Sequence, residues 1–161
     1  MAKHYYTVTW DQLHRDARAL AWRLMGRMPA GEAWSGIVAV TRGGLIPAAI
    51  VARELECRVV ESVSVTAYDE EVPGPLRITK QPAAAGDGRG FLVVDDLVDT
   101  GATIRAVRAL LPHAHYACVY AKPAGREAID TFITEVSQDT WILFPWDTEP
   151  QFVAPLVKRA T

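Results

Sequence analysis

The sequence predicts an α/β fold in which a mainly parallel sheet is covered by helices on both faces. Short apolar, β-branched runs alternate along the chain with stretches of helical periodicity, as in folds built from strand–helix–strand units. Two of these runs lead through a tight polar turn directly into a helix-like stretch. The chain has 161 residues, of which 50% are hydrophobic, and this suits one globular domain over residues 1–161 with a substantial core.

The first expected element is an amphipathic helix that starts after Thr9. Thr9 and Gln12 have the spacing of a capping box, in which each residue bonds a free backbone N–H of the first turn. Apolar residues then recur at helical spacing as far as Gly26. The residues expected to face the core are Leu13, Ala17, Leu20, Ala21 and Leu24.

Four strands and two further helices are expected after this helix. The strands are expected at 37–40, 59–65, 91–94 and 116–120, and the helices at 45–55 and about 103–111. Strands that alternate with helices pair in parallel, because each crossover returns the chain to the same edge of the sheet.

Residues 69–90 differ from the rest in composition. They contain three prolines and four glycines among many polar residues. A loop longer than about 12–15 residues inside a compact domain is usually a functional lid or a disordered piece. We therefore expect a long mobile loop here, with a single β-hairpin arm inside it as the alternative.

Charge and cysteine usage limit the classes of partner and compartment. The net charge of −2 and the pI near 6.1 provide no basic field for general nucleic-acid binding, so no nucleic-acid partner is expected. Cys57 and Cys118 are too few and too far apart for a disulfide framework, and they are expected to be buried thiols in a cytoplasmic protein. No run of about 18 apolar residues occurs, so the chain is expected to be soluble, with peripheral association on the inner membrane left open.

The most informative stretch is the acidic turn at 91–103. An apolar strand leads into Asp95, Asp96 and Asp99, and the chain then starts a helix. Adjacent residues of a strand point to opposite sides, so Asp95 and Asp96 are able to divide the binding of sugar hydroxyls and of a hard cation such as Mg²⁺. Thr100 and the helix start after it would offer N–H groups to a monophosphate. The alternative is that Asp99 or Thr100 only caps the helix and that the acid pair is a solvated strand end.

This run resembles the donor-binding signature of the type I phosphoribosyltransferases, in which two acids and a Thr-Gly-x-Thr loop follow a hydrophobic strand. The resemblance implies their fold, with a small hood and a flexible active-site loop. It implies that Asp95 and Asp96 contact the ribose of 5-phosphoribosyl 1-diphosphate (PRPP) and Mg²⁺, with Asp96 as metal ligand, and that Asp99 accepts a proton from the purine. The residues implied to hold the 5-phosphate are Thr100, Gly101, Ala102 and Thr103. Some relatives have glycine in place of Ala102, whose methyl group is tolerated if its φ is helical.

A second turn, Thr41-Arg42-Gly43-Gly44, follows the strand at 37–40. It combines one guanidinium with two residues that lack Cβ, which lets the backbone come close to an anion. Taken alone it is equally an ordinary strand-to-helix connection. The resemblance implies that Arg42, Gly43 and Gly44 receive the pyrophosphate group.

The last third of the chain resembles the xanthine-guanine branch of that family. In this branch a lysine in a Lys-Pro-Ala-Gly setting, here Lys122, contacts the exocyclic oxygen at purine position 6. Trp141 would stack on the purine, and the backbone beside Ile142 would read its other edge. Without the resemblance, Lys122 would be interpreted as a solvated surface group and Trp141 and Trp146 as core or interface residues.

The resemblance covers nearly the whole chain, from residue 6 to residue 147. It departs in the long loop, where Arg77 is our candidate for a donor-binding arginine. The activity it implies is Mg²⁺-dependent transfer of the phosphoribosyl group from PRPP to a 6-oxopurine in purine salvage, by a homotetramer. Competing hypotheses are the same chemistry on another base, such as hypoxanthine alone or orotate, and a regulatory module that binds a nucleotide or RNA. The order of preference among guanine, xanthine and hypoxanthine stays open.

Overall fold

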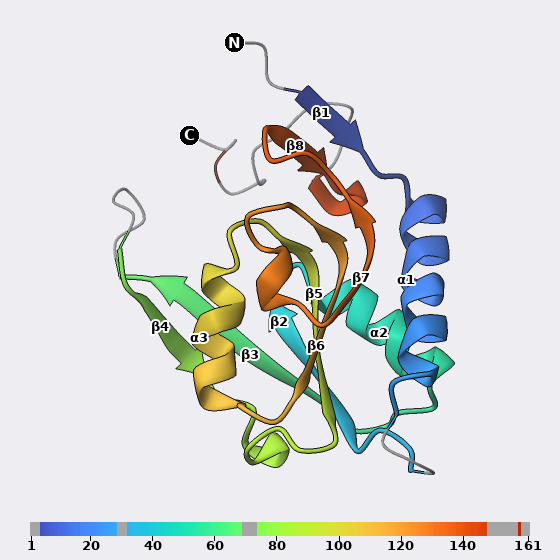
Figure 1. Cartoon of the computed structure of the whole chain (residues 1–161), viewed down its shortest axis with the longest axis vertical. Helices are drawn as coiled ribbons and strands as arrows, with labels where there is room; N and C mark the ends of the chain where they lie inside the picture. The colour runs from blue at the N-terminus through green and yellow to red at the C-terminus, as the bar shows by residue number, and fades with distance from the viewer. Residues whose placement is uncertain (1–3, 29–31, 69–73, 148–157, 159–161) are drawn as a thin grey trace.

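The computed structural model describes residues 4–28, 32–68, 74–147 and 158, and a six-stranded sheet forms its centre (Figure 1). The strand order is β4-β3-β2-β5-β6-β7. The strands are β2 (Gly36–Thr41), β3 (Val60–Ala67), β4 (Leu76–Lys80), β5 (Phe91–Val98), β6 (His115–Ala121) and β7 (Thr131–Glu135). Every pairing is parallel except that of β3 with β4. The predicted mainly parallel sheet is confirmed.

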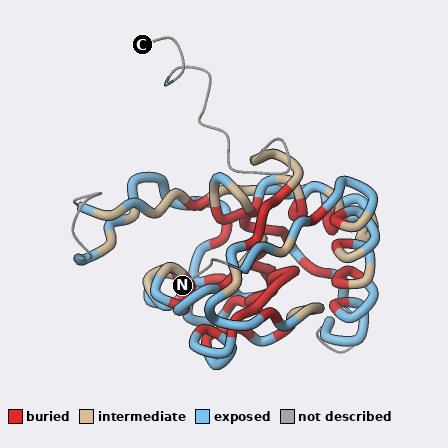
Figure 2. Tube along the Cα trace, turned by 90° about the horizontal axis from the view of Figure 1, so that it is seen from above, coloured by how far each residue is buried: buried red, intermediate tan, exposed pale blue. Residues whose placement is uncertain are grey.

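Helices cover both faces of this sheet, as predicted. Helices α1 (Trp10–Met25) and α2 (Leu45–Glu54) lie on one face, and α3 (Ala102–Leu110) lies on the other (Figure 1). Alternation along β5 builds two cores: Leu92 and Val94 join the cluster under α1 and α2, and Val93 joins the cluster under α3. Figure 2 shows the buried strands between exposed helix faces. The described residues also form three short 3₁₀ turns, η1 (Ala83–Ala85), η2 (Arg126–Ala128) and η3 (Pro145–Asp147).

Helix α1 forms as its spacing predicts. The five residues expected to face the core are all buried, and Gly26 follows the last helical residue. The Thr9 hydroxyl accepts the N–H of Gln12 at 3.2 Å, which satisfies one free donor of the first turn. The Gln12 amide donates instead to the Tyr6 hydroxyl at 2.7 Å, so only half of the capping box is present.

A separate two-stranded parallel sheet, β1 (His4–Thr7) with β8 (Thr140–Leu143), stands beyond the main sheet (Figure 1). It is the small hood that the resemblance implies, although no local pattern predicted its strands or β7. The ring of Phe144 stacks on Trp146 with centroids 4.7 Å apart, and Trp146 also contacts Trp10 of α1. Trp146 is therefore a packing residue that joins the hood to α1.

The expected long loop over 69–90 contains regular structure in its central part, and its mobility stays a prediction. Strand β4 pairs antiparallel with β3, and η1 follows it, so the alternative of a β-hairpin arm is confirmed. Pro75 and Pro82 lie outside β4, where a missing N–H does not interrupt the ladder. The run 76–80 itself carries the β-branched Ile78 and Thr79, which favour a strand. Residues 69–73 of the expected loop lie outside the described residues.

Both cysteines are buried free thiols, as predicted. In the described ranges, none of the helices has the length and apolar character that crossing a membrane requires.

Candidate active site

Three of the predicted site residues, Arg42, Asp99 and Lys122, lie where the parallel strands end. The loops after β2, β5, β6 and β7 all leave the sheet at its carboxyl edge, the position at which parallel α/β sheets bind ligands (Figure 1). These loops carry Arg42, Asp99, Lys122 and Gln138, respectively.

The acid pair lies inside β5, because the strand continues to Val98 and does not end at residue 94 as predicted. Asp95 is only 8% exposed, so it is not a solvated strand end, whereas Asp96 is partly exposed. The N–H of Asp96 donates to Asp95 Oδ1 at 2.8 Å, and the N–H of Leu97 donates to Asp96 Oδ1 at 2.7 Å. Burial raises the pKa of the Asp95 carboxyl well above its ordinary value, and the Asp96 carboxylate beside it adds to the effect. Burial also raises the pKa of Asp96.

The glycine turn after β2 packs directly on Asp96 of this pair and on the backbone of β5. A Cβ built on Gly43 would come within 2.0 Å of Asp96 Oδ2, and one on Gly44 within 2.5 Å of the Val94 carbonyl. The two turns that stand out in the sequence are therefore parts of one surface. The Thr41–Arg42 peptide is cis, and the Arg42 side chain is exposed at the rim.

The stretch proposed to hold a phosphate forms an open helix start. Gly101 is the N-cap of α3 with φ 87°, a left-handed conformation that favours glycine, and it has no side chain with which to cap the helix. The cap position is therefore Gly101 and not Asp99 or Thr100, although the Thr100 hydroxyl accepts the N–H of Ala102 at 3.4 Å. Helix α3 begins at Ala102, one residue earlier than predicted, and Ala102 is not among the described residues with positive φ. The remaining free N–H groups of this first turn form a natural anion site.

Asp99 lies between a buried lysine and a glutamine. Lys122 Nζ is 3.4 Å from Asp99 Oδ2, and Gln138 Nε2 donates to Asp99 Oδ1 at 2.6 Å. The Lys122 side chain is 7% exposed and that of Asp99 is 54% exposed, so the lysine lies deeper in the protein than the acid. This burial rules out the interpretation of Lys122 as a solvated surface group. Sequence reasoning missed Gln138, because only the pairing of β7 with β6 brings its turn to Asp99.

The two hood residues proposed for the base lie on β8. Ile142 is buried and pairs with Tyr6 of β1, and Trp141 is 49% exposed. Trp141 follows Gln138 by three residues, which places β8 next to the turn that contacts Asp99.

Arg77 lies on the hairpin arm. Its guanidinium lies 5.5 Å from the centre of the Tyr68 ring, and its Nε donates to the Thr66 hydroxyl at 3.4 Å. Thr41 at the end of β2 pairs with Ser64, and β3 continues three residues further, so the arm projects about 10 Å past β2. The described contacts of Arg77 are within this arm and do not reach the acid pair.

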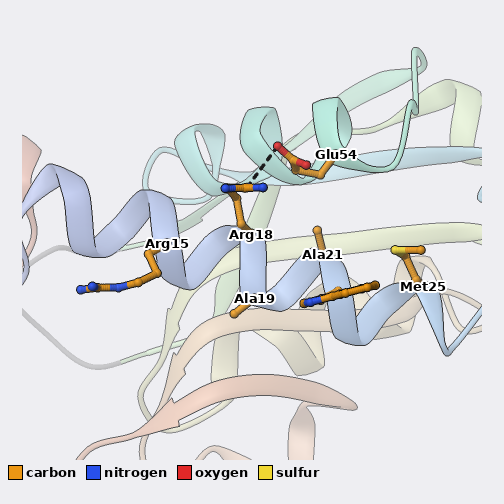
Figure 3. A pocket seen from close by; sticks show the side chains of 7 residues that line it. Arg15, Arg18, Ala19, Ala21, Met25 and Glu54 are labelled. Atoms are coloured by element: carbon orange, nitrogen blue, oxygen red, sulfur yellow. Dashed lines mark ion pairs between the residues drawn. The ribbon is translucent and has the colours of Figure 1, made fainter.

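A hollow of about 450 Å³ lies beside α1, away from these residues (Figure 3). Arg18 forms an ion pair with Glu54 across it at 3.4 Å. The lining residues are Arg15, Arg18, Ala19, Ala21, Trp22, Met25 and Glu54. None of them belongs to the predicted site.

The carboxyl edge thus combines an acid pair with one buried member, a glycine turn, a helix start with free N–H groups and a buried lysine on a parallel α/β sheet. This combination defines an enzyme of the class that binds sugar phosphates or nucleotides. The chain belongs to the phosphoribosyl transferase domain family, whose model matches residues 9–152.

Curated relatives with high sequence identity to this chain are enzymes of that family. The chain is 60% identical to a xanthine-guanine phosphoribosyltransferase of Gluconobacter oxydans, over 96% of this chain and 92% of the relative. It is 55% identical to a protein of the same name from Desulfotalea psychrophila, over 98% and 95% of the two chains. A purine phosphoribosyltransferase structure from Pyrococcus horikoshii Ot3 has a TM-score of 0.76 at 28% identity and covers 94% of this chain and 99% of its own. These similarities do not favour a regulatory or RNA-binding module.

Proposed function

We propose that the protein transfers the 5-phosphoribosyl group of PRPP to N9 of a 6-oxopurine and thereby salvages purine bases. The products would be GMP, XMP or IMP from guanine, xanthine or hypoxanthine, together with pyrophosphate. The observation that carries this proposal is the pair of Asp99 and the buried Lys122, 3.4 Å apart beside an open helix start. The names of the two bacterial relatives support the choice of base.

The donor would lie along the carboxyl edge from α3 to the glycine turn. The N–H groups and hydroxyls of 100–103 suit its 5-phosphate, and Asp95 and Asp96 suit its ribose hydroxyls. The close packing of Gly43 on Asp96 supports a site in which the pyrophosphate lies against Arg42, Gly43 and Gly44. Arg77 would reach the donor from the hairpin arm.

The acid pair fits Mg²⁺. Carboxylate oxygens are the ligands that this cation prefers, and Mg²⁺ usually binds through one or two carboxylates plus substrate phosphates. In the described part of the chain, no group of three or more acids, histidines or cysteines forms a ready-made cation cage. A Mg²⁺ site that the phosphates of the donor complete agrees with this usual coordination. Asp96 would be the protein ligand of the cation. When bound, the cation would neutralise charge on the departing pyrophosphate.

The base would lie between the hood and Lys122. Lys122 would donate to the oxygen at purine position 6, and a carbonyl group is the acceptor that a buried ammonium requires. Trp141 would cover the face of the ring, and the backbone at Ile142 would meet its other edge.

In the proposed reaction the purine N9 forms a bond to the anomeric carbon as the bond from that carbon to pyrophosphate breaks. The electron pair of the broken bond leaves with the pyrophosphate, and the proton that the purine loses passes to the Asp99 carboxylate. The enzyme mainly needs to place the two substrates and to stabilise charge as it develops. The acid pair near the cationic sugar and Arg42 near the leaving group meet those needs.

We further propose a cytoplasmic homotetramer, as the resemblance implies. Peripheral association with the inner membrane stays a prediction.

The test is release of pyrophosphate from PRPP with Mg²⁺ and each of guanine, xanthine, hypoxanthine, adenine and orotate. A reaction without base and one with a chelator are the controls. We expect release that depends on a 6-oxopurine and on Mg²⁺. Release of pyrophosphate with orotate alone would contradict the proposed base. No release with any base, together with tight RNA binding, would favour the regulatory module.

A further inference from the structure

We infer that Gln138 is a positioning residue that orients the Asp99 carboxylate for proton transfer, an inference that rests on the proposed function. Gln138 Oε1 accepts the N–H of Ala124 at 2.9 Å, and its Nε2 donates to Asp99 Oδ1 at 2.6 Å. The amide thus joins the turn after β7 to the loop after β6 and to the end of β5.

The orientation of this amide follows from its partners. A backbone N–H only donates, so the Gln138 atom facing Ala124 must be the oxygen. The NH₂ group then faces Asp99, and an ionised carboxylate only accepts. Both partners therefore select the same orientation, and the bond to Asp99 is charge-assisted.

The turn that carries Gln138 is itself held in place. The Ser137 hydroxyl donates to Asp139 Oδ1 at 2.6 Å and lies 2.6 Å from the Thr140 hydroxyl. The N–H of Thr140 donates to the Ser137 carbonyl at 3.1 Å, which closes the turn around Gln138. A glutamine fixed by its neighbours is able to hold another side chain.

Asp99 needs this support because of where it lies. Its side chain is 54% exposed, and a carboxylate in contact with water populates several rotamers unless a partner selects one. Lys122 holds only Oδ2, at a long 3.4 Å, and in the proposed function that lysine must also donate to the purine. Gln138 holds Oδ1, so Oδ2 stays directed to the side of the site where Lys122 lies.

The experiment compares the wild-type protein with Gln138→Leu, Gln138→Glu and Asp99→Asn, and with Asp99→Asn combined with Gln138→Leu. Because misplacement of a reacting group by about 1 Å costs on the order of 100-fold, we expect Gln138→Leu to lower kcat roughly 10- to 100-fold. The Kd for PRPP with Mg²⁺, measured by calorimetry without base, should stay within about twofold, as should the thermal midpoint within about 2 °C. Gln138→Glu, which places a second carboxylate against Asp99, should lose at least as much turnover.

The double variant separates positioning from an independent role. If Gln138 acts through Asp99, its loss adds nothing once Asp99 is Asn, so the double variant should match Asp99→Asn within about twofold. The matched control is Gln81→Leu, an exposed glutamine after β4, which should leave kcat unchanged. Full turnover in Gln138→Leu, or losses that multiply in the double variant, would overturn this inference while leaving the proposed function intact. Absence of turnover in the wild-type protein would contradict both this inference and the proposed function.

Discussion

Gly43 lies directly against the Asp96 carboxylate, with no room for a side chain between them. A Cβ on Gly43 would stand 2.0 Å from Asp96 Oδ2 and 2.5 Å from its Cγ, well inside the contact limit of carbon and oxygen. Asp96 is also tied to its own strand, because its Oδ1 accepts the N–H of Leu97. The position of this carboxylate therefore depends on the glycine of the neighbouring turn.

Gly43→Ala should displace Asp96 and weaken donor binding. A loss of one contact to PRPP with Mg²⁺ of about 1.4 kcal/mol corresponds to a tenfold rise in Kd, and calorimetry measures it directly. The control is Gly26→Ala at the end of α1, where a Cβ would lie 3.6 Å from the Arg23 carbonyl, an ordinary contact. An equal Kd for PRPP in the two variants would show that the glycine turn is not part of the donor site.

Asp99→Asn should lower turnover far more than donor affinity. Asparagine keeps the size of the side chain but is a far weaker proton acceptor, and general base catalysis contributes about 100- to 10,000-fold. We expect a loss of kcat in that range with guanine, with the Kd for PRPP within about threefold. Asp87→Asn, an exposed aspartate before β5, is the matched control. Unchanged turnover would remove Asp99 from catalysis.

Lys122→Met should weaken the use of every 6-oxopurine to a similar extent. The long side chain of methionine fills the buried space without the charge, so the loss reports the contacts of the ammonium with the base and with Asp99 more than packing. A hydrogen bond from a charged donor is worth about 1.5–3 kcal/mol, so kcat/KM should fall roughly 10- to 100-fold. The measurement is kcat/KM for guanine, xanthine and hypoxanthine, with Lys80→Met on β4 as control. A loss confined to one base would show that Lys122 does not read the oxygen they share.

Local patterns predicted the elements whose burial is set by their own spacing. The apolar residues of α1 repeat at helical spacing, and all five expected to be buried are buried. The end of β5 is predicted too early because acids usually mark solvent, whereas here Asp95 is buried within a strand of the parallel sheet. That burial is a property of the assembled sheet and has no local signal.

Contacts between distant segments could not be predicted from the sequence either, because they too have no local signal. β1 and β8 have four residues each and pair across most of the chain, as in Tyr6 with Ile142, so neither strand is recognisable alone. Gln138 reaches Asp99 across 39 positions and resembles any polar turn residue in sequence. The chemistry of the acidic turn is predictable from the sequence because its acids, glycine and threonines lie within one short stretch of the chain.

The base of the hairpin arm should give the protein a small pH-dependent stability. Lys80 Nζ on β4 lies 3.1 Å from Glu61 Oε2 on β3, and the N–H of Ala84 donates to Glu61 Oε1 at 3.2 Å. The hydrogen bond from Lys80 and then that from Ala84 hold the pKa of Glu61 below its ordinary value of 4.5. Because the folded pKa lies below the unfolded one, this contribution is present above about pH 4.5 and is lost as the pH falls through the folded value.

Glu61→Gln removes that titration. The free energy of unfolding, measured with urea, should therefore be lower in Glu61→Gln than in the wild-type protein at pH 7, and the difference should be smaller at a pH below 4.5. Added salt should reduce the difference at pH 7, since Lys80 is about half exposed. Glu127→Gln, an exposed glutamate in η2, should show no such trend. A difference that stays constant between the two pH values would mean that Glu61 contributes through packing and not through its charge.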